Sequence, residues 1–268
     1  MPTIQEQFFD IGANLTHESF EADLDDVISK AQESGVKRFS ITGSSLNESI
    51  SAIEIAKKFP NSCISTAGIH PHNTKEYSPS SFSEIKDLLE EDVVKSIGET
   101  GLDFYRNFSA AKQQELSFEA HLELAIETRY PLFLHERDAH NRFIEIISPY
   151  KEDLPKSVVH CFTGNKDALE KYIEMGFYIG ITGWLCDERR GKHLIDLIPI
   201  IPLDKLMIET DCPYLLPRDM GIDNSTRNEP QFLKHIAGRI AEIRPESKEL
   251  LLSACLLYTS DAADDQLG

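Results

Sequence analysis

The stretch Ile97-Gly98-Glu99-Thr100-Gly101-Leu102-Asp103 decides the fold of this chain, because it ends a buried strand on a carboxylate. Residues 93–97 form a short apolar run, which is typical of a strand inside a parallel sheet. The glycines on either side of Glu99 indicate a break in the regular backbone there. This pattern predicts a chain of buried parallel strands that carry functional side chains at their ends.

Three later apolar runs also end on side chains that can bind metal ions. They cover residues 131–135, 157–160 and 206–211, and they end on His135, His160 and Asp211. A parallel barrel brings the carboxyl ends of its strands to one mouth. Imidazole nitrogens and carboxylate oxygens together suit a divalent ion such as magnesium, manganese or zinc. The pattern therefore predicts a metal site formed by Glu99, His135, His160 and Asp211.

Apolar periodicity along the chain predicts alternating strands and helices. Strands are expected at residues 8–15, 36–43, 63–68, 93–99, 131–135, 157–160, 177–184 and 206–211. Helices are expected at residues 19–35, 47–59 with Asn47 as its N-cap, 81–90, 110–128, 139–147, 165–175, 191–198, 230–243 and 247–257. This order, without a break in composition, predicts an α/β TIM (β/α)8 barrel as a single domain over residues 1–268. An open doubly wound sheet is the alternative, disfavoured because no strand-to-helix turn carries a dinucleotide fingerprint.

The composition predicts a soluble cytoplasmic protein without a membrane segment. The 268 residues are 41% apolar, contain no apolar run of membrane-spanning length, and begin without the basic and apolar regions of a signal peptide. The five cysteines are odd in number, widely spaced and form no Cys-x-x-Cys pair, which favours reduced thiols.

The charge balance limits how the protein could bind nucleic acid. Asp and Glu number 45 against 27 Lys and Arg, so the formal net charge is −18. Such a surface repels polyanions at long range, and it argues against a duplex binder that relies on counterion release. A nucleic-acid enzyme of this composition would attract phosphate locally, through metal ions and a few arginines.

The predicted metal site suggests hydrolysis with one or two divalent ions. Glu99 would bridge two ions, His135 and His160 would complete one of them, and Asp211 would hold the other. Water bound to such an ion loses a proton near neutral pH and can attack phosphorus or a carbonyl carbon, and Asp211 could accept that proton. Glu99 and Asp211 are therefore the catalytic candidates.

Further histidines and arginines follow the strands. Three roles are open for His70 and His72, which flank Pro71: metal ligands, phosphate contacts or a rigid turn. We favour substrate contact, because the two ions are complete without them. Six arginines in the segments after the fourth, fifth, seventh and eighth strands predict a phosphate-binding rim: Arg106, Arg137, Arg189, Arg190, Arg218 and Arg227. Trp184, at the end of the seventh strand, could stack a base or be buried.

Seven motifs, in order, resemble those of the TatD family of metal-dependent deoxyribonucleases, in particular its TatD-type members. They are Asp10-Ile-Gly-Ala-Asn-Leu-Thr16, Gly68-Ile-His-Pro-His72, Gly98-Glu-Thr-Gly-Leu-Asp103, His135-Glu-Arg-Asp138, His160-Cys-Phe-Thr-Gly164, Gly180-Ile-Thr-Gly-Trp184 and Glu209-Thr-Asp-Cys-Pro-Tyr214. The resemblance covers residues 8–245. It implies a TIM barrel of the amidohydrolase-like kind and a cytoplasmic, magnesium-dependent 3′-to-5′ exonuclease that acts on single-stranded DNA and RNA, in repair of damaged ends. It also implies a monomer.

The chain departs from the family pattern at two places. Many relatives carry His-x-His after the first-strand Asp, whereas here Gly12 and Asn14 stand at those positions, as in TatD-type members. The ion nearest this strand should therefore bind weakly and prefer magnesium, with Asn14 as a substrate contact or oxygen donor. Residues 255–268 lack the usual ending of the family, and we hypothesise that they are a foreign reading-frame tail.

Two other functions are open from the residues alone. The same two ions would polarise a carbonyl, which allows an amidohydrolase or esterase, for example an aminoacyl-tRNA deacylase. A non-catalytic binding protein would follow if the metal site had decayed through Gly12 and Asn14. The arginine rim, and the lack of a carboxylated-lysine candidate after the fourth strand, favour phosphodiester hydrolysis, with Arg137 as a substrate contact.

Overall fold

The computed structural model describes residues 7–246. The last predicted helix, residues 247–257, and the atypical tail, residues 255–268, lie outside this range. Residues 7–246 divide into two compact units, one formed by residues 7–40 and 179–246 and the other by residues 41–178. The single domain expected from the sequence stays a prediction, and the two units are described in turn.

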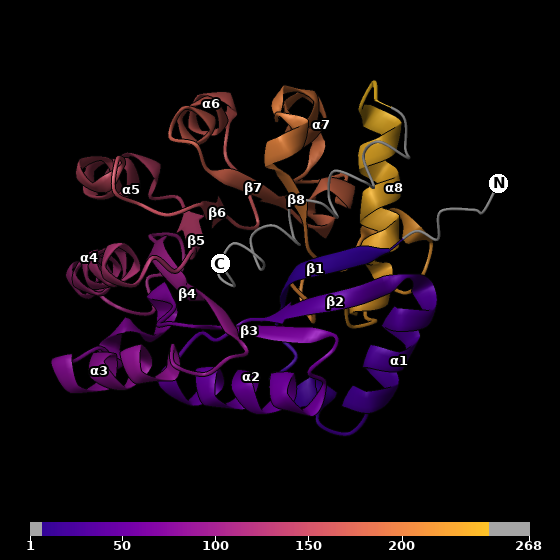
Figure 1. The fold of residues 1–268 in the computed structure, drawn as a ribbon. Coiled ribbons are helices and arrows are strands. Elements are labelled where there is room, and N and C mark those ends of the chain that lie inside the picture. Colours follow the sequence, from indigo (N-terminus) through magenta and orange to yellow (C-terminus); the bar gives the residue numbers. More distant parts are fainter. Residues whose placement is uncertain (1–6, 247–268) are drawn as a thin grey trace. The chain divides into compact units, whose positions relative to one another are not determined.

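The strands form one eight-stranded sheet in chain order, β1-β2-β3-β4-β5-β6-β7-β8. A helix follows each strand in the chain (Figure 1). This is the order of a (β/α)8 barrel, and it confirms the predicted fold class. A doubly wound sheet would reverse its strand order at a switch point, so that alternative is wrong.

The unit of residues 41–178 contains the four central strands. They are β3 (Cys63–Ala67), β4 (Val94–Asp103), β5 (Leu132–Arg137) and β6 (Ser157–Val159), paired in parallel. Its helices are α2 (Leu46–Lys58), α3 (Pro79–Leu88), α4 (Ala111–Thr128), α5 (His140–Ile147) and α6 (Lys166–Glu174). Phe118 of α4 and Phe143 of α5 stack with their ring centroids 4.8 Å apart, which joins the two helices in the apolar core.

The other unit carries the first and last strands. They are β1 (Phe8–Ala13), β2 (Val36–Ile41), β7 (Tyr178–Ile181) and β8 (Leu206–Ile208). Strands β7 and β8 are parallel, and a parallel bridge joins Ala13 at the end of β1 to Cys212 after β8. The helices here are α1 (Leu24–Ser34), α7 (Lys192–Leu197) and α8 (Leu233–Ile243).

Strand β4 is longer than expected and continues to Asp103. Gly98 and Gly101 have φ angles of +144° and +140°, which favour glycine. A Cβ atom at Gly98 would lie 2.4 Å from the carbonyl oxygen of Phe133, and one at Gly101 would lie 2.0 Å from that of His135. The two glycines therefore let β4 run close against β5 where other residues would end the strand. Glu99 and Asp103 both lie in β4 as a result.

One predicted cap is wrong. The N-cap of α2 is Ser45, whose Oγ accepts a hydrogen bond from the backbone N–H of Glu48 at 3.2 Å. Asn47 lies inside the first turn of the helix instead. Both residue types are good N-caps, so the choice between them depends on where the chain leaves β2.

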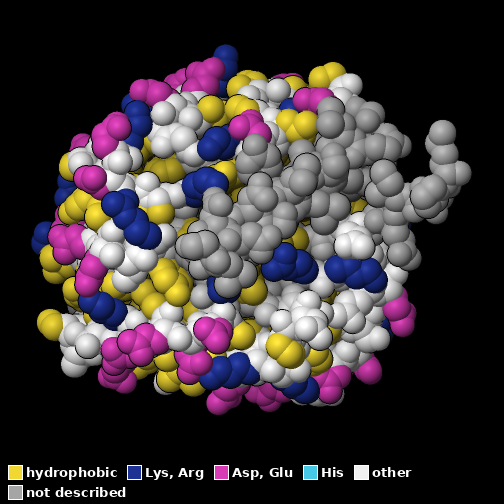
Figure 2. Space-filling view, in the orientation of Figure 1, with side chains coloured by type: hydrophobic (Ala, Val, Ile, Leu, Met, Phe, Trp, Pro, Cys, Tyr) yellow, Lys and Arg dark blue, Asp and Glu magenta, His cyan; other side chains and the backbone are white. Residues whose placement is uncertain are grey.

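Acidic and basic side chains lie among one another on the face of the protein seen in Figure 2. No helix within residues 7–246 is long and apolar enough to cross a membrane.

Candidate metal-binding active site

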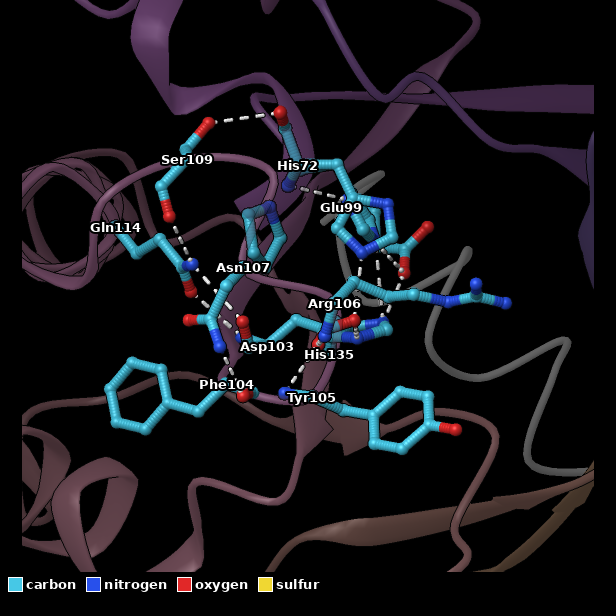
Figure 3. Close-up of polar contacts among 12 residues, drawn as sticks. His72, Glu99, Asp103, Phe104, Tyr105, Arg106, Asn107, Ser109, Gln114 and His135 are labelled. Carbon is cyan, nitrogen blue, oxygen red and sulfur yellow. Dashed lines mark hydrogen bonds and ion pairs between the residues drawn. The ribbon is translucent and has the colours of Figure 1, made fainter.

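Three histidines surround the Glu99 carboxylate in the unit of residues 41–178. The Oε1 atom of Glu99 lies 2.6 Å from Nε2 of His160, 2.8 Å from Nδ1 of His135 and 3.1 Å from Nε2 of His70. Glu99, His70 and His160 are buried. The structure thus brings together three of the four predicted ligands and adds His70, which follows β3. The dashed lines in Figure 3 mark these contacts at Glu99 and His135.

The donor atoms of this cluster fit a divalent ion. The ring nitrogens that face Glu99 crowd one another: Nδ1 of His135 lies 3.3 Å from Nε2 of His70 and 3.4 Å from Nε2 of His160. Ligand atoms of His70, Glu99 and His135 all lie within 4.8 Å of one another. Nitrogens and a carboxylate oxygen that converge this closely could hold a divalent metal ion.

The surroundings of Glu99 keep its carboxylate ionised. Burial by itself would raise the pKa of Glu99, but its electrostatic interactions with the rings of His160 and His70 and the hydrogen bonds from His135 and His160 outweigh it. The pKa of Glu99 therefore lies well below its usual value. Burial lowers the pKa of His135, yet hydrogen bonds to Asp103 and Glu99 reverse the direction and raise it. The cluster therefore pairs the ionised carboxylate of Glu99 with the ring of His135, which takes up a proton more readily than usual.

His70 differs from the other two histidines in how its ring is held. Its Nδ1 accepts a hydrogen bond from the backbone N–H of His72 at 3.0 Å, as the N-cap of a short 3-10 helix, Pro71–Glu76. Burial lowers the pKa of His70 to about 4, so the ring is neutral at pH 7. A neutral ring that accepts through Nδ1 carries its proton on Nε2. In this tautomer Nε2 of His70 is a hydrogen-bond donor that faces Glu99, and the substrate contact favoured from the sequence stays a prediction.

Asp103 joins the candidate site, although the sequence analysis did not single it out. Its Oδ2 lies 2.7 Å from Nε2 of His72 and 3.4 Å from Nε2 of His135 (Figure 3). Its Oδ1 accepts hydrogen bonds from the backbone N–H groups of Tyr105 and Arg106, at 2.9 and 2.7 Å. A carboxylate behind a ligating histidine orients the ring and raises its basicity. The signal was present in the sequence, since Asp103 closes the stretch that contains Glu99.

The unit that holds β1 and β8 contains the fourth predicted ligand. Asn14, after β1, donates from Nδ2 to Oδ1 of Asp211 at 2.8 Å. Asp211 follows β8 and has a φ of +54°, a strained conformation of the kind that recurs at functional sites. Asp10 is also buried here and accepts hydrogen bonds from the backbone and hydroxyl of Thr210. Burial raises the pKa of Asp10 to about 7 against these hydrogen bonds.

The predicted arginine rim has members in different settings. The guanidinium of Arg137, at the end of β5, lies 4.8 Å from the ring centroid of Tyr105, which is exposed. Arg227 instead pairs with Asp23 and Glu229, so it holds structure rather than facing an open site. Arg189, Arg190 and Arg218 gather around Asp187.

A second group of metal-type donors lies near α8. One ligand atom each of Cys186, Asp219 and His235 lie within 4.8 Å of one another. Nε2 of His235 is 2.6 Å from Asp219, and Nε of Arg239 lies 2.9 Å from the other oxygen of the same carboxylate. Burial raises the pKa of Cys186 far above its usual value, and Arg239 already neutralises Asp219. This group is best explained as a hydrogen-bonded packing contact.

A (β/α)8 barrel with histidines and a carboxylate at the ends of its central strands defines the class of metal-dependent barrel hydrolases. Within this class the chain belongs to the TatD family. The family described as "TatD related DNase" matches residues 9–260.

Curated relatives match nearly the whole chain. The 3'-5' ssDNA/RNA exonuclease TatD of Salmonella typhimurium is 48% identical, over 91% of this chain and 94% of the relative. The protein of the same name from Pantoea vagans is 50% identical, over 91% and 94%.

Solved structures show the same fold. A hydrolase TatD family protein from Entamoeba histolytica has a TM-score of 0.85 at 29% identity and covers 96% of this chain and 98% of that one. A TatD homologue from Escherichia coli K12 has a TM-score of 0.89 at 23% identity, with 97% and 98% covered.

Proposed function

We propose that this chain is a metal-dependent 3′-to-5′ exonuclease that hydrolyses phosphodiester bonds at the ends of single-stranded DNA and RNA. The observation that carries the proposal is the convergence of His70, His135 and His160 on one oxygen of Glu99. Relatives that are about half identical bear the name of this exonuclease, which supports the same substrate class here.

We propose a site of one or two divalent ions. Glu99, His135 and His160 would hold one ion, and Asp211 would contribute to the other. Bound there, a divalent ion would supply Lewis-acid activation of a phosphoryl oxygen and of the attacking water. Magnesium is the ion that the resemblance implies for the cell. The imidazole nitrogens also suit manganese and zinc, so the assays should compare all three.

The protein side chains have distinct proposed roles around the reaction. Glu99 is ionised and supplies the central negative charge. Asp103 orients the rings of His72 and His135. His70, His72 and Arg137 contact the strand. Asp211, oriented by Asn14, accepts the proton of the attacking water.

The first test is the degradation of single-stranded oligonucleotides that carry a label at either end. Reactions would contain EDTA, magnesium, manganese or zinc. The proposal expects metal-dependent loss of the 3′ label, together with a shortening ladder from the 5′ label. If the 5′ label were lost first, the proposed 3′-to-5′ direction of degradation would be wrong. If no metal supported cleavage, the proposed exonuclease activity would be wrong.

A second assay separates this function from carbonyl hydrolysis. A chromogenic phosphodiester and a cyclic amide would be compared with the same metal-loaded protein. Turnover of the phosphodiester alone is expected, because the arginines after β5 and β7 suit an anionic substrate. Turnover of the amide alone would support the amidohydrolase alternative instead.

We further propose that the protein acts as a monomer in the cytoplasm, in the repair of damaged ends. The four described cysteines, Cys63, Cys161, Cys186 and Cys212, form no disulfide within residues 7–246, which suits a reducing compartment. Light scattering would test the monomer. Sensitivity of a deletion strain to agents that damage DNA ends would test the role in repair.

A further inference from the structure

The segments that follow β7 and β8 enclose a small cavity. It has a volume of about 160 Å³, and its lining includes Trp184, Asp187, Arg189, Arg190, Arg218 and Asn224. The two segments are in close contact, because a Cβ atom at Gly183 would lie 2.1 Å from the carbonyl oxygen of Leu215. We call this cavity the arginine pocket. All its residues belong to the unit that contains Asp211.

A buried carboxylate organises the arginines of the pocket. Asp187 is 3% exposed, and it accepts hydrogen bonds from Nε of Arg189 at 3.0 Å, Nη2 of Arg189 at 2.7 Å and Nε of Arg190 at 2.9 Å. Its backbone carbonyl accepts from the N–H groups of Arg190 and Gly191. A guanidinium has five N–H donors, so a carboxylate on one edge leaves other donors for a second anion. The cationic groups are thus oriented before any ligand binds.

Two further features point to a ligand. The guanidinium of Arg190 lies 4.1 Å from the ring centroid of Trp184, which fixes its plane. The Nε atom of Arg218 is buried and has no hydrogen-bond partner within residues 7–246. The carboxylate oxygens of Glu188 and Asp187 lie 3.5 and 3.9 Å from it. A buried guanidinium N–H without an acceptor is costly, and an anion in the pocket would remove that cost.

The charge of the pocket contrasts with that of the chain. Three guanidiniums face two carboxylates there, whereas the whole chain carries a net charge of −18. Planar guanidinium groups match the oxygens of phosphate. The loops after strands 7 and 8 are also a frequent phosphate site in TIM barrels, because they lie on the face that binds substrates.

We propose that the arginine pocket binds a backbone phosphate of the substrate strand, at a nucleotide other than the one being removed. The inference rests on the proposed nuclease function and deepens it. The metal site would bind the scissile phosphate, and the arginine pocket would bind another phosphate of the same strand. Strands of several nucleotides should therefore bind better than a dinucleotide.

The single tryptophan of the chain provides a direct test, because Trp184 lines the pocket. Its fluorescence would be titrated with an oligothymidylate and with a thymidine dinucleotide, in EDTA so that no turnover occurs. The wild type should show a saturable change with the longer strand. Arg218→Gln and Arg190→Gln should each weaken this binding about tenfold, the loss expected for a charge-assisted hydrogen bond.

A matched control removes the same charge elsewhere. Arg129 lies in the other unit, at the end of α4, is exposed and donates to the backbone of Asp153. Arg129→Gln should change oligonucleotide binding less than about twofold, since screened surface charges contribute little. The proposal would be wrong if Arg218→Gln bound the oligonucleotide as tightly as the wild type does. It would also be wrong if Arg129→Gln lost as much affinity as Arg218→Gln. Polarisation of a labelled oligonucleotide would check the result without relying on Trp184.

Kinetics separate a failure of the pocket from a failure of the proposed function. In Arg218→Gln, KM for the longer oligonucleotide should rise by a larger factor than kcat falls. KM for the dinucleotide should rise less than KM for the longer oligonucleotide. The wild type could cleave no oligonucleotide and still show binding by Trp184 fluorescence that depends on Arg218. In that case the proposed nuclease function is wrong, and the proposed phosphate site in the arginine pocket is supported. If the wild type cleaves and Arg190→Gln and Arg218→Gln both match it, the proposed function holds and the proposed phosphate site is wrong.

Discussion

At the scale of single residues, the site depends on the charge of Glu99. Its Oε1 atom lies within 3.1 Å of one nitrogen in each of three histidine rings. A neutral side chain of the same shape would keep the packing and remove the charge.

Glu99→Gln should lower kcat by about two orders of magnitude or more, because it removes the central anionic donor of the cluster. The fold should survive, since the carboxylate of Glu99 contacts the polar rings of the site and glutamine has nearly the same shape. Circular dichroism and the oligonucleotide assay would measure both effects. Glu127→Gln, at an exposed residue paired with Lys86, is the matched control. Retention of more than about a few per cent of activity would exclude the role of Glu99.

Asp103→Asn should weaken metal binding about 10- to 100-fold, the usual effect of losing a carboxylate behind a ligating histidine. The asparagine oxygen can still accept from Tyr105 and Arg106, whereas its NH2 group can no longer accept from His72 or attract the ring of His135. Calorimetric titration with manganese would measure the change. Asp87→Asn, at an exposed position of α3, is the control, and an equal metal affinity in both variants would reject the orienting role.

At the scale of elements, helix α4 is tied to the segment after β3 by a buried histidine. Nε2 of His121 accepts from the backbone N–H of Ile69 at 3.1 Å, and Nδ1 donates to the carbonyl of Ser117 at 2.6 Å. Burial lowers the pKa of His121 to about 4. The same segment carries His70, so this contact helps to place the candidate site.

The depressed pKa of His121 makes stability sensitive to acid. Between its unfolded pKa of 6.5 and its folded pKa of about 4, the unfolded chain binds a proton that the folded chain does not. The free energy of unfolding therefore falls as the pH falls through this window. From about pH 7.5 to about pH 5, His121 should contribute a loss of about 2 kcal/mol.

His121→Gln should show a smaller loss of stability on acidification, because glutamine does not titrate and can still accept from Ile69. Urea unfolding in EDTA at both pH values, for wild type and variant, would measure the difference. The comparison cancels other titrating groups, His70 included. Equal losses in the two proteins would show that His121 does not carry this pH dependence.

At the scale of the whole molecule, metal binding should couple to stability. An ion that binds only the folded chain, at a free concentration 100 times its Kd, raises the free energy of unfolding by about 2.7 kcal/mol. For a chain of this size that corresponds to a rise in Tm of roughly 5 to 10 °C. Differential scanning calorimetry with EDTA, magnesium or manganese would measure the shift. The wild type should be stabilised and Glu99→Gln should not. An unchanged Tm in the wild type would favour the decayed, non-catalytic alternative.

The order of the elements and most ligand candidates could be predicted from the sequence, because hydrophobic periodicity is a local property. Buried parallel strands are continuous apolar runs, so the polar side chains that follow such a run, like His135 and His160, can be recognised in the sequence. Element ends were less predictable. The expected strand 177–184 ends at Ile181, and Trp184 lies in a 3-10 turn where Arg190 covers its ring.

What the sequence by itself determined was the barrel class, the family motifs and the candidate residues Glu99, His135 and His160. Only the tertiary structure decided that β4 continues to Asp103, that His70 carries its proton on Nε2, and that three arginines surround Asp187. The physical reason is that these features depend on contacts across the fold rather than on neighbouring side chains. His70 and His135 are 65 residues apart in the chain, and no local pattern records that their rings meet over Glu99.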